Sequence, residues 1–378
     1  MPPLSTGMYF LRNRARVFSQ WLIIVLAVLE VSTVGLLTGS LASGIWLNLV
    51  APLQYFTEVV ASGISIPQGI AQRIAAQPDT AAMLPILANQ MRINTLTGPS
   101  GANVFSLAAA DQPWFLKEIH EYLVAGRLPD PGQNEIAVPE LVMRSRGLHI
   151  GDVVGQKVDP NGWLPGKWQI VGVLGGKLEV GITTYSAMLQ TTALADVPGT
   201  TEYAVFARPG RAAALDNILS TLPLAEVRVY TYGAEESAFQ QDVRSLHLLV
   251  WCINIVTIAV LAIATGLLNH LQYLQRMEEF GVLAALGYGV ARLVRRAMME
   301  VAALTTLSWI TGLALSAIGA AALQRWLFGP RGVVLPTLDA RDLMYTVPIP
   351  VLMAGFTLLT VIRRLHGLDP VSVVERRG

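Results

Sequence analysis

Residues 271–300 read LQYLQRMEEFGVLAALGYGVARLVRRAMME and stand between two long apolar runs. Apolar or small residues recur in this stretch at helical spacing, at Met277, Phe280, Leu283, Ala284 and Gly287. Glu278 and Glu279 fall near the start of the pattern, where the helix dipole favours negative charge. The stretch is too polar to span a bilayer. It predicts a short amphipathic helix at the end of a membrane bundle.

The composition of the whole chain indicates a membrane protein. Of its 378 residues, 53% are hydrophobic and only 14% are charged, which departs from the norm for soluble domains. The net charge of +1 gives no indication of a nucleic-acid partner. The single cysteine, Cys252, cannot form a disulfide within the chain.

Four apolar runs predict membrane-spanning helices. The first, residues 17–41, has a length of roughly 25 residues, which suits a tilted helix in a hydrocarbon layer about 30 Å thick. No convincing small-residue cleavage site follows it, so we expect a retained anchor. Its helical pattern extends beyond the membrane as a stalk. The other runs are residues 246–269, 297–323 and 343–362, the last with Pro348 and Pro350, which predict a kink or a late helix start.

The distribution of basic residues predicts the orientation of these spans. One side carries Arg12, Arg14, Arg16, Arg276, Arg292, Arg295, Arg296, Arg363, Arg364, Arg376 and Arg377. The short loop on the other side has only Arg325, Arg331 and Arg341, partly offset by Asp339 and Asp342. We therefore expect a multi-pass membrane protein with both termini in the cytoplasm.

The long segment between the first two spans predicts a mixed domain outside the cytoplasm. Its patterns favour strands at 91–97, 104–109, 135–138, 150–154, 168–173, 202–208 and 227–232, and helices at 112–123, 139–146 and 212–222. The predicted fold class is a membrane protein with four transmembrane α-helices, one N-terminal and three C-terminal, plus an inserted extracytoplasmic α+β domain.

The predicted boundaries follow the chain in order. They are a cytoplasmic N-terminus (1–16), a first transmembrane helix (17–43), the extracytoplasmic domain with its stalk (44–243), a second transmembrane helix (244–270), a cytoplasmic coupling segment (271–296), a third transmembrane helix (297–323), a short external loop (324–342), a fourth transmembrane helix (343–362) and a cytoplasmic tail (363–378).

No enzymatic motif is present in the sequence. The phosphate-binding pattern GxxxxGK[ST] is absent, and Gly175-Gly176-Lys177-Leu178 lacks both its spacing and its hydroxyl. His120-Glu121 has no second histidine at helical spacing, and no GxSxG occurs. We expect no catalytic residue, no metal site and no cofactor bound by this chain.

Glu30 lies in the middle of the first apolar run, where a carboxylate costs a few kcal/mol. It either faces the bundle interior, where it pairs or relays a proton, or is neutral and hydrogen-bonded to a hydroxyl such as that of Ser32 or Thr33. The amphipathic stretch also has two interpretations. It rests on lipid headgroups or binds a protein, and Glu278-Glu279 favours the protein because anionic lipid would repel it.

Several motifs resemble one permease family. Arg276-Met-Glu-Glu-Phe-Gly-Val-Leu-Ala-Ala-Leu-Gly287, followed by Glu300, is similar to the R..E.G.LRALG … E signature of FtsX-like/MacB-like ABC transporter permeases, with Ala284 in place of the usual arginine. The tail Leu368-Asp369-Pro370-Val371 resembles the family's DPVEVLR ending. Gly126-Arg127-Leu128-Pro129, Asn134–Pro139, Gly147–Val154 and Trp168–Val173 resemble the MacB-type periplasmic core.

The resemblance implies a permease subunit that relays ATP-driven movement to its external domain, for export or extraction of a lipoprotein, peptide or drug. The ATPase-coupling residues would be Arg276, Glu278, Glu279, Phe280, Leu283, Ala284, Gly287 and Glu300, with a tail contact at Asp369 and Pro370. ATP and Mg²⁺ would bind to separate cytoplasmic ABC ATPase subunits.

The resemblance also implies a second permease chain, identical or different, within the lipid bilayer of a bacterial plasma membrane. It leaves open whether an extracytoplasmic adaptor joins the complex. Two other functions remain open at this point: an ATPase-independent sensor or adhesion protein with a ligand-binding external domain, and an FtsX-type activator of cell-wall hydrolases.

Overall fold

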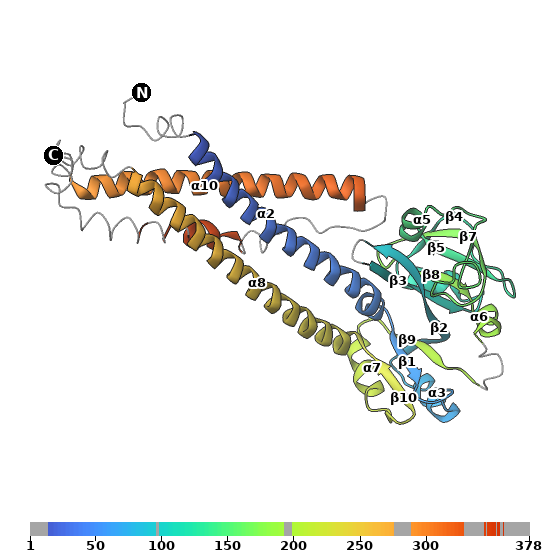
Figure 1. Ribbon diagram of the computed structural model, residues 1–378. Coiled ribbons are helices and arrows are strands. Elements are labelled where there is room, and N and C mark those ends of the chain that lie inside the picture. The colour runs from blue at the N-terminus through green and yellow to red at the C-terminus, as the bar shows by residue number, and fades with distance from the viewer. Residues whose placement is uncertain are drawn as a thin grey trace, which may run out of the picture. The chain divides into compact units, whose positions relative to one another are not determined.

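The computed structural model describes residues 14–95, 98–192, 199–275 and 289–328, and near the C-terminus residues 344, 346–352, 354, 355 and 358 (Figure 1). The chain forms two compact units. The helical unit comprises residues 1–39, 245–323 and 335–378, and the sheet unit comprises residues 40–244 and 324–334.

The helical unit contains long apolar helices: α2 (Arg14–Ile45), the part of α8 (Tyr232–Gln275) beyond residue 244, and α10 (Val290–Leu323). Among the described residues three stretches are long and apolar enough to cross a membrane, namely Val17–Gln54, Tyr232–Leu261 and Val294–Phe328. These overlap the first three predicted spans, at 17–43, 244–270 and 297–323. In the predicted fourth span, residues 348–352 are helical and residue 347 is in a turn. The count of four spans stays a prediction.

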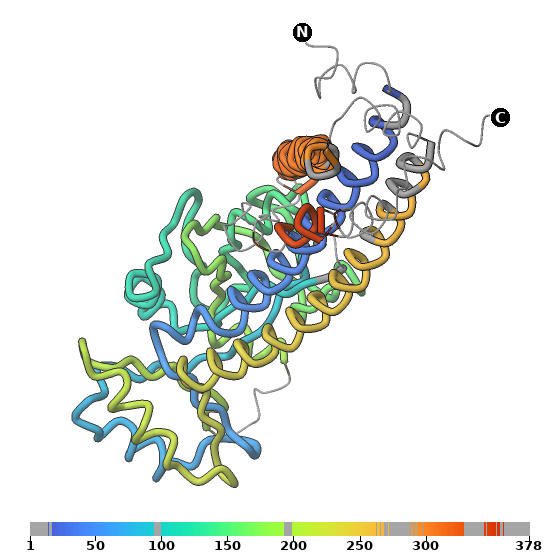
Figure 2. The backbone as a smooth tube through the Cα atoms, turned by 90° about the vertical axis from the view of Figure 1, so that its left-hand side faces the viewer, coloured from blue at the N-terminus to red at the C-terminus, as the bar shows by residue number. Residues whose placement is uncertain are grey.

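The interior of the helical unit forms around α2. Ile24, Val28 and Val31 of α2 pack with Ile258 of α8 and with Ile349. Figure 2 shows α2 and α8 side by side and running in opposite directions. Helix α10 comes so close to α2 that a Cβ atom at Gly312 would lie 2.8 Å from the Cβ of Val28. A small residue at this position therefore permits the two backbones to approach.

The sheet unit holds ten strands among its described residues, in the spatial order β10-β1-β9-β2-β3-β8-β5-β7-β4, with β6 paired to β7. Their bounds are β1 (Thr57–Ala61), β2 (Thr80–Thr95), β3 (Gly98–Leu107), β4 (Tyr122–Gly126), β5 (Glu135–Pro139), β6 (Val153–Val154), β7 (Trp168–Gly175), β8 (Gly181–Thr184), β9 (Glu202–Ala207) and β10 (Val227–Tyr230). The first part of the long strand β2 pairs with β9 and its second part with β3, so one strand belongs to both halves of the sheet.

Among the described residues, five short helices pack against the sheet. They are α3 (Gln68–Ala75), α4 (Gln112–Glu118), α5 (Glu140–Arg146), α6 (Tyr185–Thr191) and α7 (Ala212–Leu219). One core unites α3 and α7 with β1, β9 and β10, and another unites α5 and α6 with β5 and β7. A third core, here called the phenylalanine core, contains the rings of Phe56, Phe105, Phe115 and Phe206, whose contacting centroids are 5.5–5.9 Å apart. The predicted α+β class is confirmed.

Several local predictions are wrong. The helix predicted at 112–123 ends at Glu118, and Tyr122 and Leu123 belong to β4 instead. His120 adopts a φ of 59°, in the left-handed region that ends a helix, and β4 then pairs antiparallel with β7. Strand β2 begins at Thr80 rather than at residue 91, and only residues 153–154 of the strand predicted at 150–154 form β6. The sequence interpretation missed β1, α3, β8 and α6.

Candidate functional site

The predicted coupling segment lies between two well-defined helices. Helix α8 ends at Gln275 and α10 begins at Val290. The intervening coupling residues lie outside the described residues: Arg276, Glu278, Glu279, Phe280, Leu283, Ala284 and Gly287. The same holds for the tail residues Asp369 and Pro370. Their roles stay predictions, and Glu300 is the member of the predicted set that the structure places.

Glu300 is a buried carboxylate on α10. Its residue surface is 4% exposed, and its Oε1 atom lies 3.3 Å from Nε of Arg296, one turn earlier on the same helix. A buried charge is strongly destabilising once its partner is removed, so this pair holds the Arg296 side chain in place. Glu300 and Arg296 are thus paired within α10.

The environment of Glu30 in the structure matches neither of the two environments that the sequence analysis considered. Its side chain is exposed on α2, on the same side as Leu22 and Leu26, which are 38% and 54% exposed. The Thr33 hydroxyl donates instead to the carbonyl of Leu29, at 2.7 Å. Among the described residues, neither a hydrogen-bonded partner nor a buried position for Glu30 is found.

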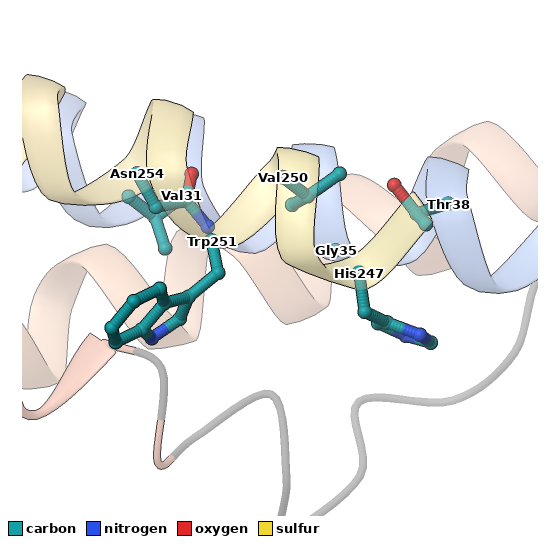
Figure 3. A pocket seen from close by; sticks show the side chains of 7 residues that line it. All are labelled: Val31, Gly35, Thr38, His247, Val250, Trp251 and Asn254. Atoms are coloured by element: carbon teal, nitrogen blue, oxygen red, sulfur yellow. The ribbon is translucent and has the colours of Figure 1, made fainter. Parts of the chain in front are cut away.

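A pocket lies between α2 and α8 in the helical unit (Figure 3). It is lined by Val31, Gly35 and Thr38 of α2 and by His247, Val250, Trp251 and Asn254 of α8. The Thr38 hydroxyl is used locally, since it donates to the carbonyl of Val34 at 2.8 Å. These seven residues include neither a carboxylate nor a thiol, so the pocket lining offers no carboxylate–histidine pair and no thiol nucleophile.

Helix α2 ends within the sheet unit, and helix α8 begins within it. Beyond α2, the chain continues as a π-helix (Trp46–Val50) and a 3-10 helix (Ala51–Gln54), and Trp46, Leu47 and Leu53 pack into the phenylalanine core. The Asn48 side chain donates to the carbonyl of Gly44 at 3.0 Å, and the Asn103 side chain donates to the carbonyl of Asn48. The stalk predicted after the first span is thus helical, and the sheet unit holds it by packing and by hydrogen bonds.

Helix α8 is attached in a comparable way. It begins at Tyr232, directly after the strand β10, and the hydroxyl of Thr231 accepts a hydrogen bond from the backbone N–H of Ala234 at 3.3 Å. Tyr230 and Tyr232 pack against the phenylalanine core. The sequence interpretation began this helix too late. The signal for the earlier start was Thr231, which caps the helix, together with Glu235 and Glu236 in its first turns.

Carboxylates gather where α8 meets the sheet. Burial, together with the charges of Glu202 and Glu235, raises the pKa of Glu58 on β1 to about 7. Burial also raises the pKa of Glu202 on the neighbouring strand β9, although the N–H of Ala88 donates to its Oε2 atom at 2.6 Å. Among the described residues no group of three or more histidine, cysteine, aspartate or glutamate side chains could hold a metal ion.

The raised pKa of Glu58 predicts a pH-dependent stability. Since this pKa lies above that of an unfolded glutamate, the folded state binds the proton more tightly, and the resulting stability is lost as the pH rises from 4.5 through about 7. We expect the variant Glu58→Gln to stabilise the sheet unit at pH 8 by on the order of 2 kcal/mol. The difference should vanish near pH 4.5, as measured by urea denaturation at both pH values.

Glu226→Gln, at an exposed position in the same unit, is the matched control. An equal gain for both variants at pH 8, or a gain for Glu58→Gln that persists at pH 4.5, would contradict the assignment.

Comparison with known families matches the C-terminal region. Residues 251–370 match the family model described as FtsX-like permease C-terminal. The C-terminal third of the chain resembles the FtsX-like permeases. The FtsX-like region includes most of α8 beyond the sheet unit, the predicted coupling segment and α10. With the three apolar helices, it indicates a permease-like membrane protein.

Solved structures similar to part of the chain include a periplasmic region and an extracellular domain. The periplasmic region of MacB from Actinobacillus actinomycetemcomitans is 10% identical, at a TM-score of 0.32 over 49% of this chain and 92% of that one. The extracellular domain of the noncanonic ABC-type transporter YknZ from Gram-positive bacteria is 11% identical, at a TM-score of 0.29 over 46% and 100% of the two chains. No curated protein matches the sequence.

Proposed function

We propose that this chain is the permease subunit of an ABC transporter complex that transmits ATP-driven movement across the membrane. The observation that carries the proposal is the match of residues 251–370 to the FtsX-like permease C-terminal family. Work by a separate ATPase would enter at the coupling segment and move the sheet unit, for export or extraction of a lipoprotein, peptide or drug.

The attachment of the helices to the sheet unit supports this mechanism. The continuation of α2 is embedded in the phenylalanine core, and α8 leaves that core through Tyr230 and Tyr232. Both helices therefore join their apolar segments to the sheet unit without a long intervening loop. In the proposed mechanism these continuous helices would carry a displacement into the sheet unit, whose close-packed core transmits strain.

The topology that we propose has four spans, with both termini cytoplasmic and the boundaries predicted from the sequence. Three apolar helices and the helical residues 348–352 are consistent with it. A bacterial plasma membrane would hold the complex. ATP and Mg²⁺ would bind to the partner ATPase.

A second permease chain is the partner that we propose for the exposed face of α2. Glu30 lies on that face near the middle of the span, and a charged side chain at the bilayer centre is costly, by roughly 2.5–3.5 kcal/mol on insertion scales. Contact with a polar group of a second chain would relieve this cost. Whether that chain is identical or different is left open.

A different function would be an ATPase-independent sensor or adhesion protein with a ligand-binding sheet unit. The FtsX-like match argues against it, because that match includes the predicted coupling segment. Activation of cell-wall hydrolases would use the same force transmission with a different external partner.

Co-purification with the cognate ATPase tests the proposal. We expect the wild-type chain to retain an ATPase and to show no ATP turnover by itself. Phe280→Asp should abolish the association, because a carboxylate would replace an apolar contact on the amphipathic helix. Quantitative mass spectrometry of the purified complex measures the retained subunit.

Leu224→Asp is the matched control, since Leu224 is 77% exposed on a loop of the sheet unit. It should retain the ATPase. ATP turnover by the isolated chain would refute the permease assignment, and an unchanged association of a folded Phe280→Asp variant would exclude this helix as the docking site.

A further inference from the structure

Two arginines near the start of α10 have no counter-charge among the described residues. Arg292 and Arg295 are both exposed, and the first turn of α10 contains no acidic residue. Arg296 differs from them, because it is half-buried and paired with Glu300. Basic side chains at a helix N-terminus oppose the helix dipole, so helix stability does not account for this pair.

The position of these arginines along α10 is that of a membrane interface. The apolar stretch that could cross a membrane begins at Val294, between the two exposed arginines. Guanidinium groups at this level would lie near lipid phosphates rather than in bulk water. Arginine also binds phosphate through two parallel N–H donors, which makes it well suited to such a group.

The same face of α10 continues as an exposed apolar track. Residues 292, 295, 299, 302, 303, 306 and 310 follow each other mostly at three- or four-residue intervals, which places them on one side of a helix. Met299 and Ile310 are 50% and 53% exposed, and Ala302, Ala303 and Thr306 between them are exposed as well. Residues 299–310 of this face form an exposed strip, in which the small residues Ala302, Ala303 and Thr306 lie between Met299 and Ile310.

We propose that this face of α10 binds an anionic phospholipid, with the phosphate at Arg292 and Arg295 and an acyl chain along Met299, Ala302, Ala303 and Thr306. Charge complementarity selects an anionic headgroup, and the apolar strip selects a lipid over an acidic soluble protein, which would leave the strip uncovered. The proposal depends on α10 lying in a membrane, and it does not depend on an ATPase partner.

Native mass spectrometry of the full chain released from detergent micelles tests the site. The protein is incubated with phosphatidylglycerol or with phosphatidylcholine of the same acyl chains. We expect wild type to retain phosphatidylglycerol preferentially, and Arg292→Gln/Arg295→Gln to lose on the order of tenfold in that retention, because each basic group contributes to anionic lipid binding. Ala302→Phe should weaken retention while both arginines remain.

Arg73→Gln/Arg228→Gln is the matched control, because it removes two exposed arginines from the sheet unit. It should bind lipid as wild type does. Soluble glycerol phosphate distinguishes a whole lipid from a free phosphate group and should not compete. An equal loss in the control, full competition by glycerol phosphate, or unchanged binding by Arg292→Gln/Arg295→Gln would overturn the proposal. It would also be overturned if that variant lost the ATPase and kept the lipid.

Discussion

Replacement of Gly312 by leucine is expected to disrupt the packing of α10 on α2. A Cβ atom at Gly312 would lie 2.8 Å from Cβ of Val28 and 3.3 Å from the carbonyl oxygen of Val25. The Val25 oxygen belongs to the backbone and cannot move away without displacing the helix. Overpacking of this kind costs typically 1–3 kcal/mol. We expect a lower thermal unfolding temperature of the full chain in detergent, together with reduced ATPase stimulation in the complex.

Gly319→Leu provides the control on the same helix. A Cβ atom at Gly319 has nothing within 4 Å, and the same side chain should therefore be tolerated there. Equal losses of stability for the two variants would show that the effect comes from any leucine in α10. Unchanged stability of Gly312→Leu would contradict the close contact between α10 and α2.

Replacement of Trp168 by alanine is expected to destabilise the sheet unit by about 3–5 kcal/mol, the usual cost of truncating a buried aromatic residue. Trp168 is 0% exposed at the start of β7, and its indole N–H donates to the carbonyl of Pro165. Strand β7 pairs with β4, β5 and β6, so a cavity beneath it weakens this half of the sheet. Limited proteolysis of the full chain across a urea series measures the loss.

Trp163→Ala is the control, since Trp163 is 39% exposed in the preceding loop. Its loss should leave the proteolysis midpoint close to that of wild type. If the two variants unfolded at the same urea concentration, the assignment of Trp168 to the core would be wrong.

The long helices of this protein are predictable because their residues carry the information locally. A helix such as α10 satisfies all of its backbone hydrogen bonds within one segment, and an apolar run of sufficient length then indicates a membrane span. The coarse α+β class follows from alternating strand and helix patterns in the same way. Strand β5 and helix α5 were predicted nearly in full because Pro139 separates them.

Other elements depend on contacts that no local pattern contains. Tyr122 and Leu123 continue a helical pattern, yet they form β4 because β7 offers an edge for pairing. The carboxylate of the neighbouring Glu121 also accepts a hydrogen bond from the N–H of Leu178, at 2.8 Å and 57 residues away. Strand β8 has only four residues. It forms a strand because it pairs with β3 on one side and with β5 on the other.

Residues 271–300 also combine features that the local sequence determines with features that only the tertiary structure decides. Their amphipathic spacing and their motif are properties of neighbouring residues, so the sequence alone predicted a coupling segment between two long helices. The family match includes these residues, and their coupling role stays a prediction. The environments of individual side chains required the tertiary structure. Glu300 is buried beside Arg296, and Glu30 is exposed on α2. Helical periodicity assigns a residue to a face of its helix, and only the packing of other helices decides whether that face is covered.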